Sequence, residues 1–101
     1  MAVFSNPASP DVEDEYNTWY NEVHLKDLLA VPGVVGATRY RLAGGASPSP
    51  SEHRYLALYE LDGPQETVLA AFGSGSAAVS PTVDAAGARI LFWEPVPGGS
   101  G

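Results

Sequence analysis

The feature that most constrains the fold is a long amphipathic segment that starts near residue 9. Ser9, Pro10 and Asp11 supply a hydroxyl N-cap, a proline for the first helical position and an acidic first turn, all of which favour a helix start. Apolar side chains then recur every three or four residues, at Val12, Tyr16, Trp19, Tyr20 and Val23. This spacing builds one apolar stripe, which we expect to face a sheet.

The stripe changes register near His24. If it continued unchanged, Asp27 would lie in its middle and the leucines of residues 25–29 would turn to the opposite side. A single straight helix could not bury both sets of side chains. We therefore expect the helix to break near His24 and a second short turn to follow, up to residues 31–33. His24 is then expected at a bend, where the apolar stripe ends.

Four further segments have the features of strands, and they alternate with two helices. Strand patterns cover residues 2–6, 34–42, 53–61 and 88–94, each bounded by Pro, Gly or Ser. A second, shorter helix is expected between the last two strands, closed by Gly73. The predicted order is therefore β-α-β-β-α-β.

The remaining segments are too rich in Gly, Ser, Ala and Pro to form elements. Residues 43–51 are expected to form an exposed hairpin loop, and residues 74–87 a second loop. Because 101 residues suffice for about one core, we expect a single domain over residues 1–97 and a flexible tail over residues 98–101.

Two successive β-α-β halves predict an α+β, ferredoxin-like fold, with a four-stranded antiparallel sheet and both helices on one face. We assign Tyr55, Tyr59 and Trp93 to the other, bare face. An apolar surface of this extent is rarely left in water, so we expect a second copy to cover it and form a dimeric α/β barrel. The space between sheet, first helix and partner would hold a hydrophobic small-molecule substrate.

Charge and motif content exclude several classes of function. Five basic against twelve acidic residues give a net charge of −7, which disfavours nucleic acid and anionic membranes as partners. No apolar run approaches the roughly 20 residues of a membrane span, and the N-terminus lacks a signal-peptide pattern, so we expect a cytoplasmic protein. The two histidines have no metal-binding spacing, and no nucleotide-binding motif occurs. We expect neither a metal nor a cofactor.

His24 is the catalytic candidate, because the pKa of imidazole lies nearest to neutrality. The alternative is a histidine that caps the helix end and donates to a carbonyl. From the residues alone, these two roles are evenly balanced.

The candidates for substrate contacts are mostly tyrosines, whose buried hydroxyls need partners. Arg39 or Arg41 could hold a carboxylate or enolate, although arginines more often pair with surface acids. Asn6 could donate to an oxyanion, although a turn before Pro7 is its commoner use. The predicted substrate-binding residues are Tyr20, Tyr55, Tyr16, Tyr59, Tyr40, Arg39, Trp93 and Asn6. The tyrosines could equally be core residues.

Four stretches of the chain resemble the EthD-like group of dimeric α/β-barrel proteins. They are Asn6-Pro7, residues 19–25 (WYNEVHL), residues 29–35 (LAVPGVV) and residues 54–61 (RYLALYEL). The resemblance covers most of residues 3–72 and weakens over residues 74–87. It implies the dimeric barrel fold and favours a functional role for His24. Members act in bacterial polyketide and pigment pathways, and the wider superfamily includes cofactor-free monooxygenases, polyketide cyclases and haem-handling enzymes.

These observations lead us to expect a cofactor-free enzyme of secondary metabolism. It would act on an apolar cyclic or aromatic polyketide-type intermediate by proton transfer through His24, in a cyclisation, dehydration or isomerisation. The first alternative is a cofactor-independent monooxygenase. The second is a non-catalytic protein that binds a hydrophobic small molecule.

Overall fold

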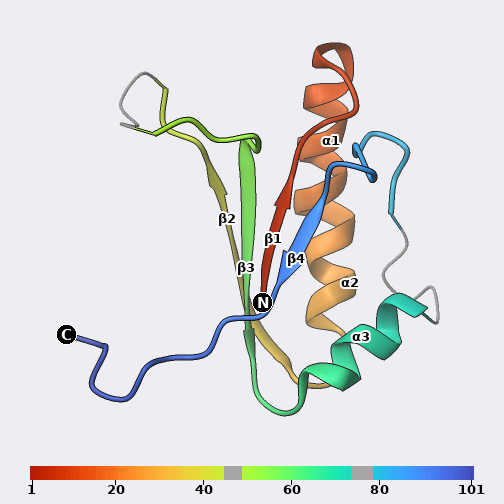
Figure 1. Ribbon diagram of the computed structural model, residues 1–101. Coiled ribbons are helices and arrows are strands. Elements are labelled where there is room, and N and C mark those ends of the chain that lie inside the picture. The colour runs from red at the N-terminus through yellow and green to blue at the C-terminus, as the bar shows by residue number, and fades with distance from the viewer. Residues whose placement is uncertain (45–48, 74–78) are drawn as a thin grey trace.

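The computed structural model describes residues 1–44, 49–73 and 79–101 (Figure 1). Parts of both predicted loops, residues 45–48 and 74–78, therefore lie outside the described residues. The strands are β1 (Ala2–Ser5), β2 (Val34–Arg41), β3 (Tyr55–Leu61) and β4 (Arg89–Leu91). A long helical segment joins β1 to β2, and α3 (Gln65–Gly73) lies between β3 and β4. The predicted β-α-β-β-α-β order is confirmed.

The four strands form one antiparallel sheet in the order β2-β3-β1-β4. β1 and β2 lie on either side of β3 and run antiparallel to it, so the first helical segment crosses over the sheet to connect them. Figure 1 shows α1, α2 and α3 on the same side of the sheet. The predicted antiparallel sheet with helices on one face is therefore observed.

The first helical segment does not break at His24. It consists of a 3₁₀ turn η1 (Pro10–Val12), α1 (Glu13–Trp19), a π-helical turn η2 (Tyr20–His24) and α2 (Leu25–Leu29). The His24 backbone is helical, with φ −67° and ψ −44°. A π turn accommodates one extra residue and so rotates the apolar stripe without interrupting the helix. The predicted change of register is real, but the predicted break is wrong.

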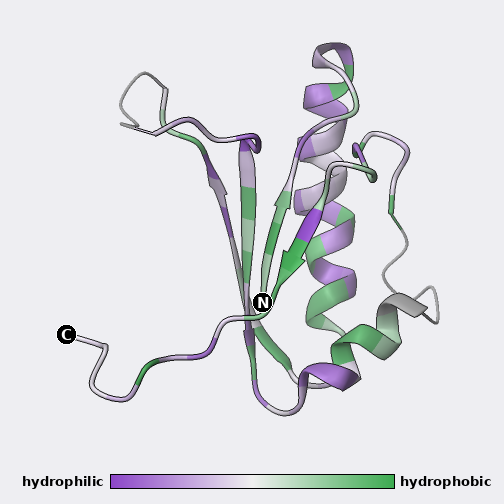
Figure 2. Cartoon of the chain, viewed as in Figure 1, coloured by the Kyte–Doolittle hydropathy of each residue, from purple (hydrophilic) through white to green (hydrophobic). Residues whose placement is uncertain are grey.

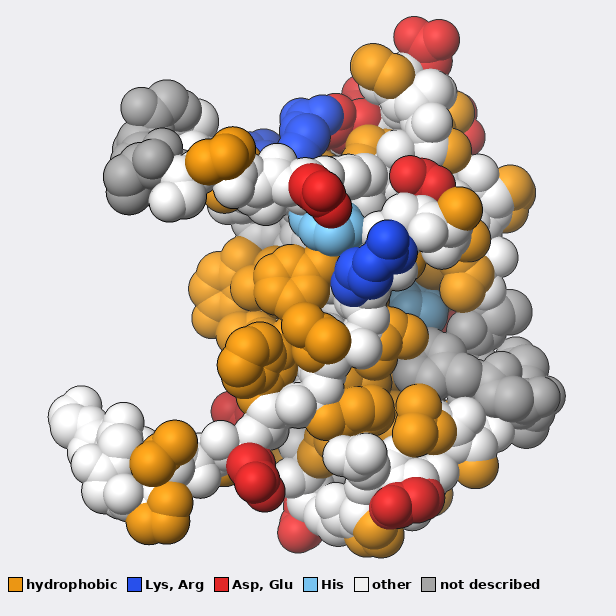
Figure 3. All heavy atoms as spheres, viewed as in Figure 1, with side chains coloured by type: hydrophobic (Ala, Val, Ile, Leu, Met, Phe, Trp, Pro, Cys, Tyr) orange, Lys and Arg blue, Asp and Glu red, His pale blue; other side chains and the backbone are white. Residues whose placement is uncertain are grey.

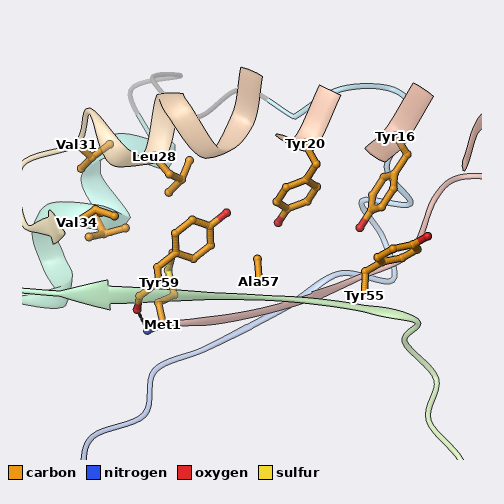
Figure 4. Packing of buried hydrophobic residues seen from close by; sticks show 10 residues of the cluster. Met1, Tyr16, Tyr20, Leu28, Val31, Val34, Tyr55, Ala57 and Tyr59 are labelled. Carbon is orange, nitrogen blue, oxygen red and sulfur yellow. Dashed lines mark hydrogen bonds between the residues drawn. The ribbon is translucent and has the colours of Figure 1, made fainter. Parts of the chain in front are cut away.

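The rotated stripe packs on the helix-covered face of the sheet (Figure 4). Tyr16 and Leu28 are completely buried, one on each side of the π turn. Tyr16 and Tyr20 point from the helix toward the sheet, and Tyr55 and Tyr59 point back from β3. The interior is thus a core of tyrosines flanked by aliphatic residues.

The position of Tyr55 and Tyr59 corrects their predicted assignment to the bare face. Successive strand residues point to opposite faces, and β3 turns Tyr55, Ala57 and Tyr59 toward the helices. Leu56 and Leu58 consequently face the other way. The phenol rings fill the space between β3 and the helical segment, whose apolar stripe is rotated at η2. The alternation of apolar and polar residues along β3 does not reveal which face of the strand the helices cover.

The face of the sheet away from the helices is apolar and open. Its exposed side chains include Leu58 on β3, Tyr40 on β2 and Leu91 on β4. Figure 3 shows hydrophobic side chains gathered there, left of centre in the view. Figure 2 shows hydrophobic stretches along β1, β3 and β4, whereas α1 is coloured hydrophilic to nearly neutral.

Candidate functional site

A cavity of about 220 Å³ lies between the first helical segment and the β1/β4 half of the sheet. Its lining is mainly apolar and comes from three parts of the chain: Val3, Ser5, Trp19, Tyr20, His24, Val79, Val83, Ala85, Ala88 and Ile90. We call this space the His24 cavity. Ligand sites are typically lined in this way, with a few polar groups among apolar walls.

His24 is buried in the wall of this cavity. Only 6% of the residue is exposed, and its Nδ1 atom has no hydrogen-bond partner among the described residues. The side chain does not cap a helix end either, which removes support for the alternative role considered from the sequence. Buried polar atoms in proteins are nearly always paired, so this unpaired nitrogen marks a candidate functional atom.

Two aromatic rings fix the His24 ring. Trp19 stacks on it with ring centroids 4.6 Å apart and an interplanar angle of 22°. Tyr20 meets it edge to face at 4.9 Å. Trp19 and His24 are five positions apart, and a π-helical turn, whose hydrogen bonds join residues i and i+5, brings such residues above one another. The π turn therefore builds the stack as well as rotating the stripe.

The surroundings of His24 favour its neutral form. Burial lowers the pKa of His24 below the usual 6.5; the negative charge of Asp27 opposes this shift in part, and the positive charge of Arg39 adds a smaller lowering. A neutral imidazole carries a lone pair on one ring nitrogen and can accept a proton. His24 is consequently in the form required of a base.

The tyrosines near the cavity differ in their hydrogen bonding. Tyr16 shares a hydrogen bond of 2.5 Å with the Ser5 hydroxyl. The Tyr59 hydroxyl is buried without a partner among the described residues, and Figure 4 shows it pointing toward the Tyr20 hydroxyl. Burial raises the pKa of both Tyr20 and Tyr59. These phenols are therefore hydrogen-bonding groups rather than anions at neutral pH.

Residues 79–88 form the outer wall of the cavity. Val83 pairs with Pro7 in an isolated β-bridge, and backbone hydrogen bonds join Ala8 N to Thr82 O at 2.7 Å and Asp84 N to Asn6 O at 3.0 Å. These contacts fasten residues 82–84 to the chain just after β1. The sequence pattern gave no sign of this role, because a segment rich in Ala and Ser resembles any exposed loop.

Arg39 lies on the other side of Tyr20, outside the His24 cavity. Its guanidinium group lies 4.3 Å from the centre of the Tyr20 ring and donates to the side-chain oxygens of Asn21 (2.8 Å) and Asn17 (3.0 Å). Tyr55 belongs to the same region, since its hydroxyl accepts from Asn17 and donates to Glu13 at 2.5 Å. The hydrogen bond from Tyr55 lowers the pKa of Glu13.

Three other predicted residues lie away from the His24 cavity. Trp93 is 71% exposed and lines a separate groove of about 770 Å³. Tyr40 is half exposed on β2. Both ends of the Asn6 amide are engaged, the nitrogen donating to the Glu52 carbonyl and the oxygen accepting from the Arg54 N–H, so Asn6 ties the end of β1 to residues 52–54.

Of the predicted residues, the structure brings His24 and Tyr20 to the cavity, with Tyr16 behind them. Ser5 and Trp19 are additional lining residues. Trp19 belonged to the predicted stripe, but its stacking on His24 depends on the π turn. Ser5 carried no signal in the sequence beyond its place at the end of a strand.

Across the parts of the chain that the structure describes, no three His, Asp or Glu side chains cluster in a way that could hold a metal ion. None of the described helices has the length and apolar character needed to cross a bilayer. No family model matches the sequence, and neither the curated proteins nor the solved structures yield a match.

Proposed function

We propose that this chain is a cytoplasmic, homodimeric, cofactor-free enzyme that transfers a proton on an apolar cyclic or aromatic intermediate of polyketide type. The observation that carries the proposal is the position of His24, which is buried in the wall of an apolar cavity and whose Nδ1 atom has no hydrogen-bond partner among the described residues. Cyclisation, dehydration and isomerisation all begin with such a proton transfer.

The proposed step uses a carbon acid beside a carbonyl group. His24 Nδ1 takes the proton, the C–H electron pair forms a carbon–carbon double bond, and the carbonyl oxygen becomes an enolate oxygen. The imidazolium then returns the proton to the same carbon or to another atom of the ligand. A positioned base of this kind contributes about 10²- to 10⁴-fold in rate, which suffices for an intermediate that is already reactive.

The size of the His24 cavity limits the substrate. Its volume of about 220 Å³ is below the roughly 300–1,000 Å³ of sites for drug-sized ligands. The cavity therefore suits a ligand, or a portion of one, with one or two rings. Stacked Trp19 and the edge of Tyr20 would select flat, unsaturated molecules.

The proposed fold class is the ferredoxin-like, dimeric α/β barrel of the EthD-like group. The strand order β2-β3-β1-β4 supports the ferredoxin-like fold. The open apolar face, with Leu58, Tyr40 and Leu91 exposed, supports the dimeric barrel, because packing against the sheet of a second copy would remove this surface from water.

The proposed activity can be tested with 2-tetralone, a two-ring ketone with an acidic carbon beside its carbonyl. We expect the protein to accelerate exchange of this carbon's hydrogen for deuterium in heavy water, followed by proton NMR. His24→Phe keeps a ring against Trp19 but removes the base, so exchange should fall by about a hundredfold or more. His53→Gln is the matched control, since His53 bonds to the Gly87 carbonyl outside the cavity.

The other outcomes separate the alternatives. Oxygen uptake that accompanies ketone consumption would instead support a cofactor-independent monooxygenase. Suppose that 2-tetralone binds equally well to the wild type and to His24→Phe, and that its hydrogen exchanges for deuterium at the same rate with both. The protein is then a binding protein, and the enzymatic proposal is wrong.

The dimer can be tested with a pair of leucine variants of similar exposure. Leu58 is 40% exposed on the open sheet face, and Leu29 is 44% exposed on α2. We expect Leu58→Glu to convert a dimer into a monomer in light scattering, because it places a charge in the apolar contact. Leu29→Glu should remain a dimer. A monomeric wild type would contradict the proposed barrel.

A further inference from the structure

Positive charge is concentrated at one end of an otherwise acidic protein. The chain has five basic residues in total against twelve acidic ones. Three of them, Arg39, Arg41 and Arg54, surround Tyr55: the guanidinium groups of Arg39 and Arg54 lie 5.2 Å and 5.9 Å from its ring, and Arg41 is its partner across the β2/β3 ladder. Such clustering needs a local explanation.

Among the residues that the structure describes, only one of these three charges is neutralised by an ion pair. Arg54 forms two hydrogen bonds with the Glu13 carboxylate, at 3.0 Å and 2.9 Å. Arg39 donates only to the neutral side-chain oxygens of Asn17 and Asn21. Arg41 makes no hydrogen bond or ion pair with any described residue and feels Glu13 only at longer range.

The two unneutralised arginines line a groove of about 360 Å³ together with Asn17, Asn21, Tyr40 and Tyr55. We call it the Arg39/Arg41 groove. It lies along β2, which is an edge strand of the sheet. Its volume falls within the range of small-molecule sites, and its lining brings two guanidinium groups together with two side-chain amides.

We infer that the Arg39/Arg41 groove binds a small carboxylic acid. The planar guanidinium fork matches a carboxylate in geometry and charge, and Arg39 and Arg41 lie two positions apart on the same face of β2. A small acid fits better than a polyanion, because the net charge of −7 repels extended anionic chains at long range.

This groove is separate from the His24 cavity. Tyr20 stands between them, with the Arg39 guanidinium 4.3 Å from its ring centre and the His24 ring 4.9 Å away. A ligand in the groove therefore does not reach His24. The inference does not depend on the proposed proton transfer, and each can fail without the other.

The test is titration of the full chain with benzoate, followed by NMR of the backbone amides and by calorimetry. We expect benzoate to bind with shifts concentrated around the groove. Arg41→Gln should weaken binding about tenfold or more, since it removes one charged partner. Arg41 is exposed and unpaired, so this variant should remain folded. His24→Phe should bind benzoate like the wild type.

Arg89→Gln is the matched control, because Arg89 is an exposed arginine that donates only to the backbone carbonyls of Ala86 and Ala88. It should leave benzoate affinity unchanged. Absence of benzoate binding in the wild type, or an equal loss in Arg41→Gln and Arg89→Gln, would overturn the inference. Inorganic phosphate serves as the second probe. Phosphate binding as tight as that of benzoate would also overturn it, because the groove would then attract negative charge without preferring a carboxylate.

Discussion

The regions on the two sides of Tyr16 and Tyr20 differ in polarity and in hydrogen bonding. On the β1/β4 side lies the His24 cavity, which is mainly apolar and is lined by a buried ring nitrogen that has no partner in the described parts of the chain. On the β2 side lies a polar network in which Arg39, Asn17, Tyr55 and Glu13 are joined by hydrogen bonds. Both sides are built on the same helical segment and the same sheet.

The comparison shows where this fold gains stability and where it retains reactive groups. Each paired group in the network offsets the cost of its own burial, and together they hold the helix in place. The unpaired nitrogen of His24 recovers nothing for its lost hydration. Unpaired, uncharged and enclosed groups of this kind are typical of functional sites.

The largest expected effect comes from removing the side chain that both regions share. Tyr16 is completely buried, hydrogen-bonds Ser5 and contacts Tyr20 and Tyr55. Tyr16→Ala should lower the free energy of unfolding by about 3–5 kcal/mol, as for other large aromatic truncations. The measurement is chemical denaturation followed by circular dichroism. Tyr40→Ala, at a half-exposed position, should lower the free energy of unfolding much less. A similar decrease in both variants would contradict the view that Tyr16 supports both regions.

A smaller effect distinguishes two tyrosines of β3. Tyr55→Phe removes a hydroxyl that bonds both Glu13 and Asn17 and should lower the free energy of unfolding by about 1–3 kcal/mol. Tyr59→Phe removes a buried hydroxyl that has no hydrogen-bond partner in acceptable geometry among the described residues and should cost less than Tyr55→Phe. Denaturant titrations of the two variants measure the difference. Equal losses would show that the Tyr59 hydroxyl is paired as well as that of Tyr55.

The smallest effect is a pH dependence that belongs to the cavity side. Because the folded state lowers the pKa of His24 below 6.5, the unfolded chain binds a proton more readily as pH falls through the window below about 6.5. The free energy of unfolding should therefore decrease as pH falls through that window, and His24→Phe should lose this part of the decrease.

The comparison of wild type with His24→Phe isolates this effect. The lowered pKa values of Glu13 and of the Met1 amino group also reduce stability toward acid, but they act equally in both proteins. The measurement is denaturant titration at several pH values between about 7.5 and about 5. Parallel curves for the two proteins would mean that His24 titrates in the folded protein as it does in the unfolded chain.

Local patterns were sufficient for the element order and for the change of helical register near His24. Ser9, Pro10 and Asp11 mark a helix start through contacts within one turn, and the clash of Asp27 with the stripe identifies a register change from helical spacing alone. The resulting β-α-β-β-α-β order and the antiparallel sheet agree with the structure. These features depend on interactions between residues close in the chain.

What only the tertiary structure decided depends on distant contacts. Strand alternation defines two faces of β3 but not which one the helices cover, so Tyr55 and Tyr59 were assigned to the wrong face. The π turn that joins the two registers, the stacking of Trp19 on His24 and the fastening of residues 82–84 beside β1 all depend on packing. Many backbone conformations are compatible with the same local sequence pattern. Only the assembled core selects one of them, because the side chains must fill the space between this helical segment and this sheet.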